Sequence, residues 1–169
     1  METLIKILSI VLIISSSNET YEDWMMDKAW SSMTEQERYE SPVEYKARAV
    51  GLTVEEFDLM SRVVEAESDR SNSIDGRILI ALTLYNRVED SQFKDTITDV
   101  CYESGQFQVV ENGAIWSVGR TNLSDWAIIE AHRWIAEGDA PYVLYFNNSG
   151  YSYGVPYGYV DGNYFVIGG

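Results

Sequence analysis

One segment of the chain combines a regular helical pattern with a charge in an unexpected place. Between Thr53 and Glu67, apolar residues recur every three or four positions, which at about 100° per residue places them on one face of a helix. The apolar stripe consists of Phe57, Met60, Val63 and Val64. Glu67 follows Val64 by three positions and falls near the centre of this stripe, whereas Glu65 points the opposite way. The pattern therefore predicts an amphipathic helix that directs Glu67 inward and leaves Glu65 in water.

A carboxylate on the apolar face of a helix suggests chemistry, because burying an unpaired charge is costly. A carboxylic acid in a partly apolar pocket keeps its proton near neutral pH and can donate it to a leaving oxygen. Thr53 and Glu56 have the spacing of a capping box and mark the start of this helix. Glu67 is therefore the candidate general acid of the chain.

The rest of the pattern predicts more helices, followed by a small β element. The expected elements are a central helix from Ile74 to Val88, a short helix from Thr96 to Tyr102, an extended segment from Gln106 to Val110, a helix from Asp125 to Glu137 capped by Ser124, and a strand from Tyr142 to Asn147. Asp161-Gly162 separates two strand-like runs and predicts a β-hairpin. The fold class is therefore α+β, mainly helical with a small C-terminal hairpin or sheet.

Composition changes along the chain suggest three parts. Residues 1–17 contain an apolar run followed by serines, which is typical of a signal peptide or N-terminal anchor. The run is shorter than the roughly 20 residues of a membrane span, so no stable span is expected, although a buried first helix is an alternative. Residues 18–52 form an acidic helical linker or appendage, and residues 53–169 the catalytic domain. The expected location is secreted or in the cell envelope.

Charge and composition exclude several functions. The net charge of −15 argues against nucleic acid and anionic lipid as partners. The chain has one cysteine, Cys101, and one histidine, His132, both in apolar patterns that favour the core. A disulfide within the chain and a zinc site built on cysteines are therefore excluded, and we expect no metal or cofactor. The 12 tyrosines and 5 tryptophans suit carbohydrate binding, and the expected oligomeric state is a monomer.

An ordered series of short motifs carries a family resemblance. The series is Arg62-Val-Val-Glu-Ala-Glu67, Asp75-Gly76, Asn86-Arg87-Val88, Ser104-Gly-Gln-Phe107, a helix ending at Gly138, Leu144-Tyr-Phe-Asn147 and Gly162-Asn-Tyr-Phe165. Over about residues 53–168, the chain resembles the cell-wall hydrolase domain of spore cortex-lytic enzymes, the SleB/CwlJ type. The resemblance implies a lysozyme-like fold and peptidoglycan glycan strands as the partner. It also implies lytic cleavage between N-acetylmuramic acid and N-acetylglucosamine that leaves 1,6-anhydro ends.

The same resemblance assigns roles to individual residues. Glu67 takes the place of the catalytic acid, and the motifs around Asn86 and Arg87 are interpreted as structural. The substrate-binding candidates are Tyr102, Gln106, Phe107, Tyr145, Asn147 and Tyr164. Tyr164 stands where the family commonly has a histidine, and the turn after Glu67 lacks the usual glycine. The tyrosines at 151, 153, 157 and 159 are candidates either for stacking on sugars or for packing across strands.

Two alternatives remain open at this point. A hydrolytic muramidase or phage-type lysin usually needs a second acid, and Asp69, Asp75 and Glu111 are available on loops, although solvated surface is the simpler interpretation. The second alternative is a non-catalytic glycan-binding module, a protein that kept the fold but has no activity.

Overall fold

The computed structural model describes residues 30–68 and 73–168, in two compact units, Met1–Ser41 and Pro42–Gly169. In the first unit, helix α3 (Glu35–Glu40) begins at a capping box. The Glu37 backbone N–H donates to the Thr34 hydroxyl, and the Glu37 carboxylate accepts from the Thr34 backbone N–H. The expected signal or anchor segment, residues 1–17, lies outside the described residues.

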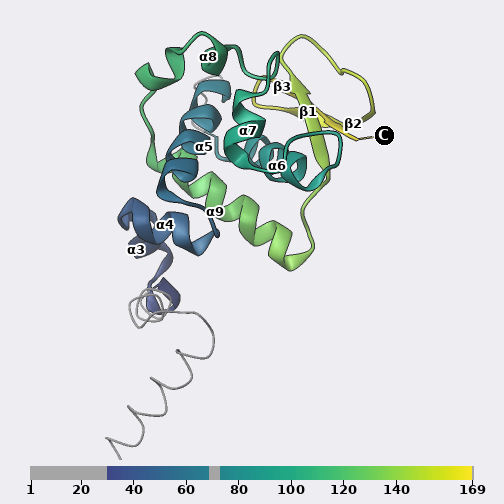
Figure 1. Ribbon diagram of the computed structural model, residues 1–169. Helices are drawn as coiled ribbons and strands as arrows, with labels where there is room; N and C mark the ends of the chain where they lie inside the picture. Colours follow the sequence, from purple (N-terminus) through teal and green to yellow (C-terminus); the bar gives the residue numbers. More distant parts are fainter. Residues whose placement is uncertain (1–29, 69–72, 169) are drawn as a thin grey trace, which may run out of the picture. The chain divides into compact units, whose positions relative to one another are not determined.

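The second unit consists of helices followed by a small sheet (Figure 1). Its elements are α4 (Val43–Ala49), α5 (Val54–Glu67), α6 (Asp75–Glu89), α7 (Ile97–Tyr102), α8 (Gln108–Glu111), the 3-10 helix η1 (Ala114–Ser117), α9 (Asn122–Glu137), β1 (Val143–Asn147), β2 (Val155–Val160) and β3 (Asn163–Ile167). The three strands are antiparallel in the order β1-β3-β2. The predicted α+β class, mainly helical with a small terminal sheet, is confirmed.

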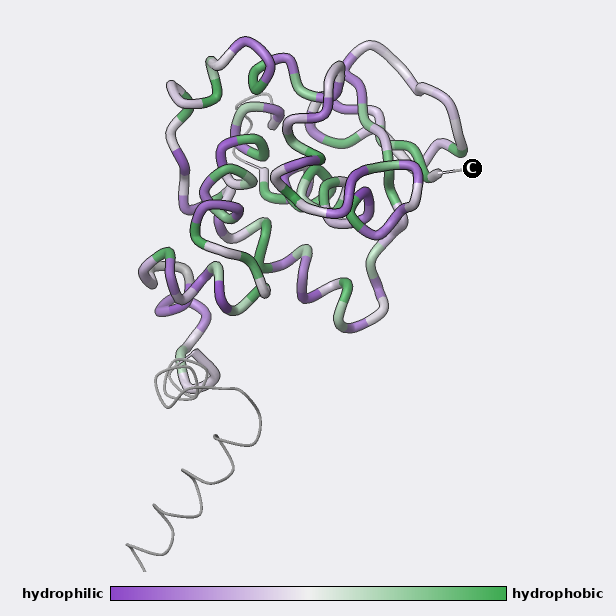
Figure 2. The backbone as a smooth tube through the Cα atoms, in the orientation of Figure 1, coloured by the Kyte–Doolittle hydropathy of each residue, from purple (hydrophilic) through white to green (hydrophobic). Residues whose placement is uncertain are grey.

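The core surrounds α6, which packs against α9, α5 and α7 and against β1. Eleven of its 15 residues are buried, as expected for a helix that is apolar on most sides. The predicted apolar stripe of α5 is fully buried, and the capping box at Thr53 starts this helix. Figure 2 shows hydrophobic and hydrophilic residues alternating along the turns of α5 and α9, the pattern of helices with one buried face.

Helix α4 belongs to the same unit as the core, because it packs against α5 and α9. The Lys46 ammonium donates to the Asp125 carboxylate of α9 at 3.0 Å, and both side chains are 3% exposed. Asp125 also accepts from the Ser61 hydroxyl of α5 and from Arg120. The compact unit thus begins at Pro42, whereas the functional division after residue 52 stays a prediction.

Two predicted elements were wrong in detail. Residues 106–110 do not form an extended segment, because only Phe107 is extended and α8 starts at the next residue. The single helical turn buries Val110 in the core, so tertiary packing overrides the β preference of the two valines. Helix α9 begins at Asn122, because Thr121 rather than Ser124 is the cap and Ser124 completes its capping box.

The β2–β3 hairpin turns at Asp161 and Gly162, which both have positive φ, 48° and 87°, as a tight two-residue hairpin turn requires. The Asp161 carboxylate accepts a 2.8 Å hydrogen bond from the backbone N–H of Gly76 at the start of α6. A Cβ atom at Gly76 would lie only 2.7 Å from the Asp161 Cβ, so glycine permits this close approach. The turn is therefore attached to the helices.

Along residues 30–68 and 73–168, no helix combines the length and the apolar character needed to cross a membrane.

Candidate active site

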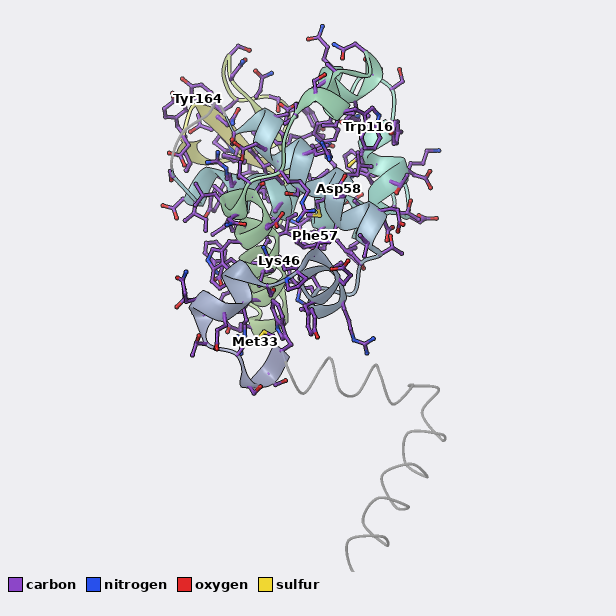
Figure 3. The ribbon with its side chains drawn as sticks, turned by 90° about the vertical axis from the view of Figure 1, so that its left-hand side faces the viewer. Met33, Lys46, Phe57, Asp58, Trp116 and Tyr164 are labelled. Atoms are coloured by element: carbon purple, nitrogen blue, oxygen red, sulfur yellow. The ribbon has the colours of Figure 1, made fainter. Side chains whose placement is uncertain are left out.

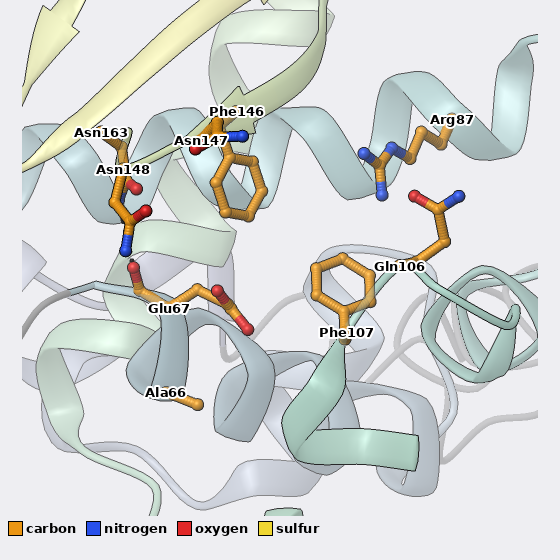
Figure 4. A pocket seen from close by; sticks show the side chains of 9 residues that line it. All are labelled: Ala66, Glu67, Arg87, Gln106, Phe107, Phe146, Asn147, Asn148 and Asn163. Carbon is orange, nitrogen blue, oxygen red and sulfur yellow. Dashed lines mark hydrogen bonds between the residues drawn. The ribbon is translucent and has the colours of Figure 1, made fainter. Parts of the chain in front are cut away.

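A pocket of about 320 Å³ lies where several elements end (Figure 4). Its lining residues are Ala66, Glu67, Arg87, Gln106, Phe107, Phe146, Asn147, Asn148 and Asn163. They come from the end of α5, the end of α6, the turn before α8, the end of β1 with the residue after it, and the start of β3. Figure 4 shows Glu67 at one end, Arg87 and Gln106 at the other, and the two phenylalanines between them.

Glu67 is the last residue of α5, and its carbonyl accepts a 3.1 Å hydrogen bond from the side-chain amide of Asn163. Burial raises the pKa of the Glu67 carboxyl, and the nearby Arg87 cation opposes this more weakly. The negative end of the α5 dipole also disfavours the carboxylate form. Glu67 is the only carboxyl group among the described residues that line the pocket. The geometry therefore places a group suited to holding a proton at the pocket wall.

Arg87 is a buried cation, with only 4% of its surface exposed. Its Nε donates to the Leu144 carbonyl at 2.9 Å, which connects α6 to β1. Its guanidinium lies over the rings of Phe93, Phe107 and Tyr145, at 5.0, 5.5 and 6.0 Å from their centroids. Burial lowers the pKa of Arg87 to about 10, which leaves it charged at neutral pH.

One guanidinium nitrogen of Arg87, Nη1, is buried without a hydrogen-bond partner among the described residues. A buried donor without a partner is uncommon in folded proteins. Arg87 lines the pocket, but Nη1 itself is covered by neighbouring atoms. The neighbouring Asn86 instead donates to the carbonyls of Pro141 and Val143 and agrees with a structural role.

The structure brings four of the predicted site residues together: Glu67, Gln106, Phe107 and Asn147. The other three lie outside the pocket lining. Tyr102 is half exposed at the end of α7, Tyr145 packs against the Phe93 ring, and Tyr164 contacts two other tyrosine rings. The substrate-binding role of all these residues stays a prediction.

No functional signal for Asn148 and Asn163 is visible in the sequence, and the motif around Arg87 was interpreted as structural alone. Asn163 belonged to a family motif, but only the fold shows that its amide reaches the end of α5. A cation near the end of a helix that is apolar on most sides was the one available hint of a second role for Arg87.

The expectation that Glu65 lies in water was wrong. Its side chain is 17% exposed and accepts two hydrogen bonds from Arg77 of α6, from Nε at 3.1 Å and from Nη2 at 3.0 Å. The Thr121 hydroxyl donates a third, at 2.7 Å. A helical wheel describes one helix alone, so it does not reveal that α6 and the start of α9 cover this side of α5. Glu65 is a structural partner of Arg77 and does not line the pocket.

The remaining candidates for acid or nucleophile lie apart from the pocket lining. Glu111 is exposed, and its pKa is lowered by hydrogen bonds from the Gly105 backbone N–H and the Ser104 hydroxyl. Asp75 is exposed at the start of α6, and Asp69 lies outside the described residues. Cys101 is buried in the core, and burial raises its pKa to about 12, which makes it a poor nucleophile.

Within the described ranges, no three His, Cys, Asp or Glu side chains are grouped in a way that could hold a metal ion.

Comparison with known proteins identifies a matching family and solved structures of similar fold. The profile of one family, described as Cell Wall Hydrolase, matches residues 71–160, a match that begins after Glu67. The spore cortex-lytic enzyme of Oceanobacillus iheyensis is 28% identical over 97 residues, which are 57% of this chain and 34% of the relative. The chain thus spans about a third of the length of this curated relative.

Two solved structures are similar over most of the chain. The catalytic domain of the Bacillus cereus SleB protein has a TM-score of 0.57 at 23% identity, covering 68% of this chain and 91% of that one. The catalytic domain of the germination-specific lytic transglycosylase SleB from Bacillus anthracis has a TM-score of 0.57 at 22% identity, covering 69% and 97%. At this identity the likeness concerns the fold, and it confirms the predicted lysozyme-like architecture.

Proposed function

This chain belongs to the cell wall hydrolase family, and we propose that it cleaves peptidoglycan as a lytic transglycosylase. The bond to be cut joins N-acetylmuramic acid to N-acetylglucosamine. The observation that carries the proposal is Glu67, a largely buried carboxyl group with a raised pKa and the only one among the described residues of the pocket lining. The Bacillus anthracis structure, a lytic transglycosylase by its description, supports the same reaction class.

In the proposed mechanism, protonated Glu67 donates its proton to the glycosidic oxygen while the C1–O bond breaks. The new Glu67 carboxylate would stabilise the positive charge that develops on the sugar ring. That carboxylate then removes the proton from the C6 hydroxyl of the same sugar, and O6 forms a bond to C1. The product is a 1,6-anhydro sugar, and Glu67 regains its proton. One carboxyl group serves both steps, whereas hydrolysis usually employs a second one to activate water or to act as nucleophile.

The other pocket residues would bind and orient the glycan. The half-buried ring of Phe146 lies 6.4 Å from the buried ring of Phe107, between Glu67 and Arg87, and offers apolar surface to a sugar ring or an acetyl methyl group. Gln106 and Asn147 supply amides for sugar hydroxyl and acetamido groups. The Arg87 guanidinium would place a positive charge near a carbonyl or carboxylate oxygen of the substrate.

We place this activity in the cell envelope or the medium, because peptidoglycan lies outside the cytoplasm. We further propose that the protein acts as a monomer.

The test is digestion of purified peptidoglycan by wild type and by Glu67→Gln, with mass spectrometry of the fragment ends. Anhydro ends from the wild type and none from Glu67→Gln are the expected result. Reducing ends would identify a hydrolase instead, and binding without released fragments would identify a glycan-binding module. Normal digestion by a folded Glu67→Gln variant would refute the assignment of the acid.

A further inference from the structure

Three tyrosines form a cluster on the open face of the small sheet. Tyr164 of β3 contacts Tyr159 of β2, with ring centroids 4.5 Å apart, and Tyr151 of the preceding loop, with centroids 5.0 Å apart in an edge-to-face arrangement. Tyr159 is 60% exposed and Tyr151 is 47% exposed, whereas Tyr164 between them is partly covered. We call Tyr151, Tyr159 and Tyr164 the tyrosine platform.

The register of the sheet connects this platform to the pocket. Asn147 of β1 pairs with Tyr164 of β3, and Tyr164 pairs with Tyr159 of β2. Directly paired residues on neighbouring strands lie on the same face of a sheet, so these three side chains form one row across it. Asn147 is also a lining residue of the pocket. The platform therefore meets the pocket at Asn147, at the end of β1, whereas the pocket residues Phe146 and Asn163 lie on the other face of the sheet.

The opposite face of the sheet belongs to the core. Phe165, the next residue along β3, is completely buried and its ring lies 5.8 Å from that of Phe146. Figure 3 shows Tyr164 at the outside of the sheet, in contrast to Phe57 in the interior. The tyrosine rings are thus not needed to cover the core, and two of them expose about half of their surface or more to solvent.

The charge of this region limits what it can bind. From Pro141 to the end of the chain there is no lysine or arginine, and Asp161 is the only acidic residue. The Asp161 carboxylate is already bonded to the backbone of Gly76. A surface without cations suits neither nucleic acid nor anionic lipid. Neutral, aromatic surface with hydroxyl groups at its edges fits a neutral sugar, whose C–H face stacks on a ring while its hydroxyls form hydrogen bonds.

We propose that the tyrosine platform is a second carbohydrate-binding surface, which holds the glycan strand of peptidoglycan beyond the pocket that contains Glu67. The choice of glycan rests on the proposed function. Sugars bound on the platform would anchor the polymer next to the acid, so that affinity for long strands exceeds what the pocket alone supplies. The chemistry at Glu67 does not depend on the platform, because none of the three tyrosines lines the pocket.

The experiment measures binding of the full chain to insoluble peptidoglycan by sedimentation, with Glu67→Gln in every sample so that the polymer stays intact. The test variant is Tyr151→Ala/Tyr159→Ala, which leaves the half-buried Tyr164 in place. The matched control is Trp116→Ala, because Trp116 is equally exposed, at 60%, but belongs to η1 rather than to the sheet. Thermal unfolding of each variant verifies that it is folded.

We expect the double variant to raise the Kd about tenfold, a factor equivalent to about 1.4 kcal/mol, and Trp116→Ala to leave the Kd unchanged. Equal Kd values for the double variant and the control would overturn the proposal that the tyrosine platform binds glycan. Loss of a dimer from the double variant in analytical ultracentrifugation, without loss of glycan binding, would also overturn it, because the surface would then bind a second copy of the chain.

The outcome is separable from that of the proposed function. Failure of wild type to release fragments would refute the transglycosylase, whereas tyrosine-dependent binding in the same preparation would still support the platform.

Discussion

Replacing Glu65 with glutamine should destabilise the fold and leave the chemistry at Glu67 in place. Glu65 accepts two hydrogen bonds from the guanidinium of Arg77, whose side chain is 3% exposed, and one from the hydroxyl of Thr121. Removing one partner of a buried ion pair costs about 3–5 kcal/mol, because the other charge stays buried without compensation. Glutamine keeps one acceptor oxygen, which recovers about 1–2 kcal/mol.

The expected net loss is therefore about 1–4 kcal/mol, with a central value of about 2.5 kcal/mol. For a chain of this size, each kcal/mol lowers the Tm by about 2–4 °C, so the variant should unfold about 5–10 °C below wild type. Circular dichroism at pH 7 measures this shift. Peptidoglycan digestion well below both melting temperatures should proceed at nearly the wild-type rate, because Glu65 does not line the pocket. Glu55→Gln is the control, because Glu55 is an exposed glutamate in the first turn of the same helix.

Two results would contradict this reasoning. If Glu65→Gln has the same Tm as Glu55→Gln and the wild type, the contact with Arg77 contributes no stability. If Glu65→Gln keeps the wild-type Tm but loses digestion, Glu65 rather than Glu67 carries the reaction.

Three further predictions concern charged groups. Burial raises the pKa of Glu67 above its value in the unfolded chain. The stability that protonated Glu67 contributes is therefore complete below the unfolded pKa and is lost as pH rises through the folded pKa. Calorimetry should show Glu67→Gln melting at a higher temperature than wild type at pH 7 but not at pH 4. Arg87→Met removes the cation that opposes this shift, so the alkaline limb of the kcat/KM profile should move to higher pH. Asp125→Asn leaves Lys46 buried without its counter-charge and should lower the unfolding free energy in urea by about 3 kcal/mol or more. In the wild type, hydrogen bonds, first from Arg120, outweigh burial and lower the pKa of Asp125, so this stabilisation should be lost as pH falls through the folded pKa.

Local patterns predicted the features that depend on one element at a time. The stripe and capping box of α5 needed only the spacing of residues between Thr53 and Glu67. The turn at Asp161-Gly162 required only the backbone preferences of those two residues. Glu67 became a candidate because its own helix turned it inward.

Contacts between elements could not be predicted from the hydrophobic pattern of each element alone. Arg77 lies on the next helix, and nothing in the period of α5 indicates that it pairs with Glu65. Asn163 reaches the Glu67 carbonyl across 96 positions of sequence. The prediction of an extended segment at Val109 and Val110 was wrong for a related reason. Burial against the core, rather than β preference, determines the conformation of this segment.

The pocket depends on side chains that bind the backbone of another element. Arg87 of α6 holds the Leu144 carbonyl of β1, Asp161 of the hairpin turn holds the first turn of α6, and Asn163 of β3 holds the Glu67 carbonyl. These three bonds attach the sheet to α5 and α6 and thereby position it relative to the acid. Because the sheet also carries the tyrosine platform, the same bonds set the distance between Glu67 and a glycan held there. A substitution of Asp161 or Asn163 should thus alter the alignment of a long strand with the acid more than the acidity of Glu67 itself.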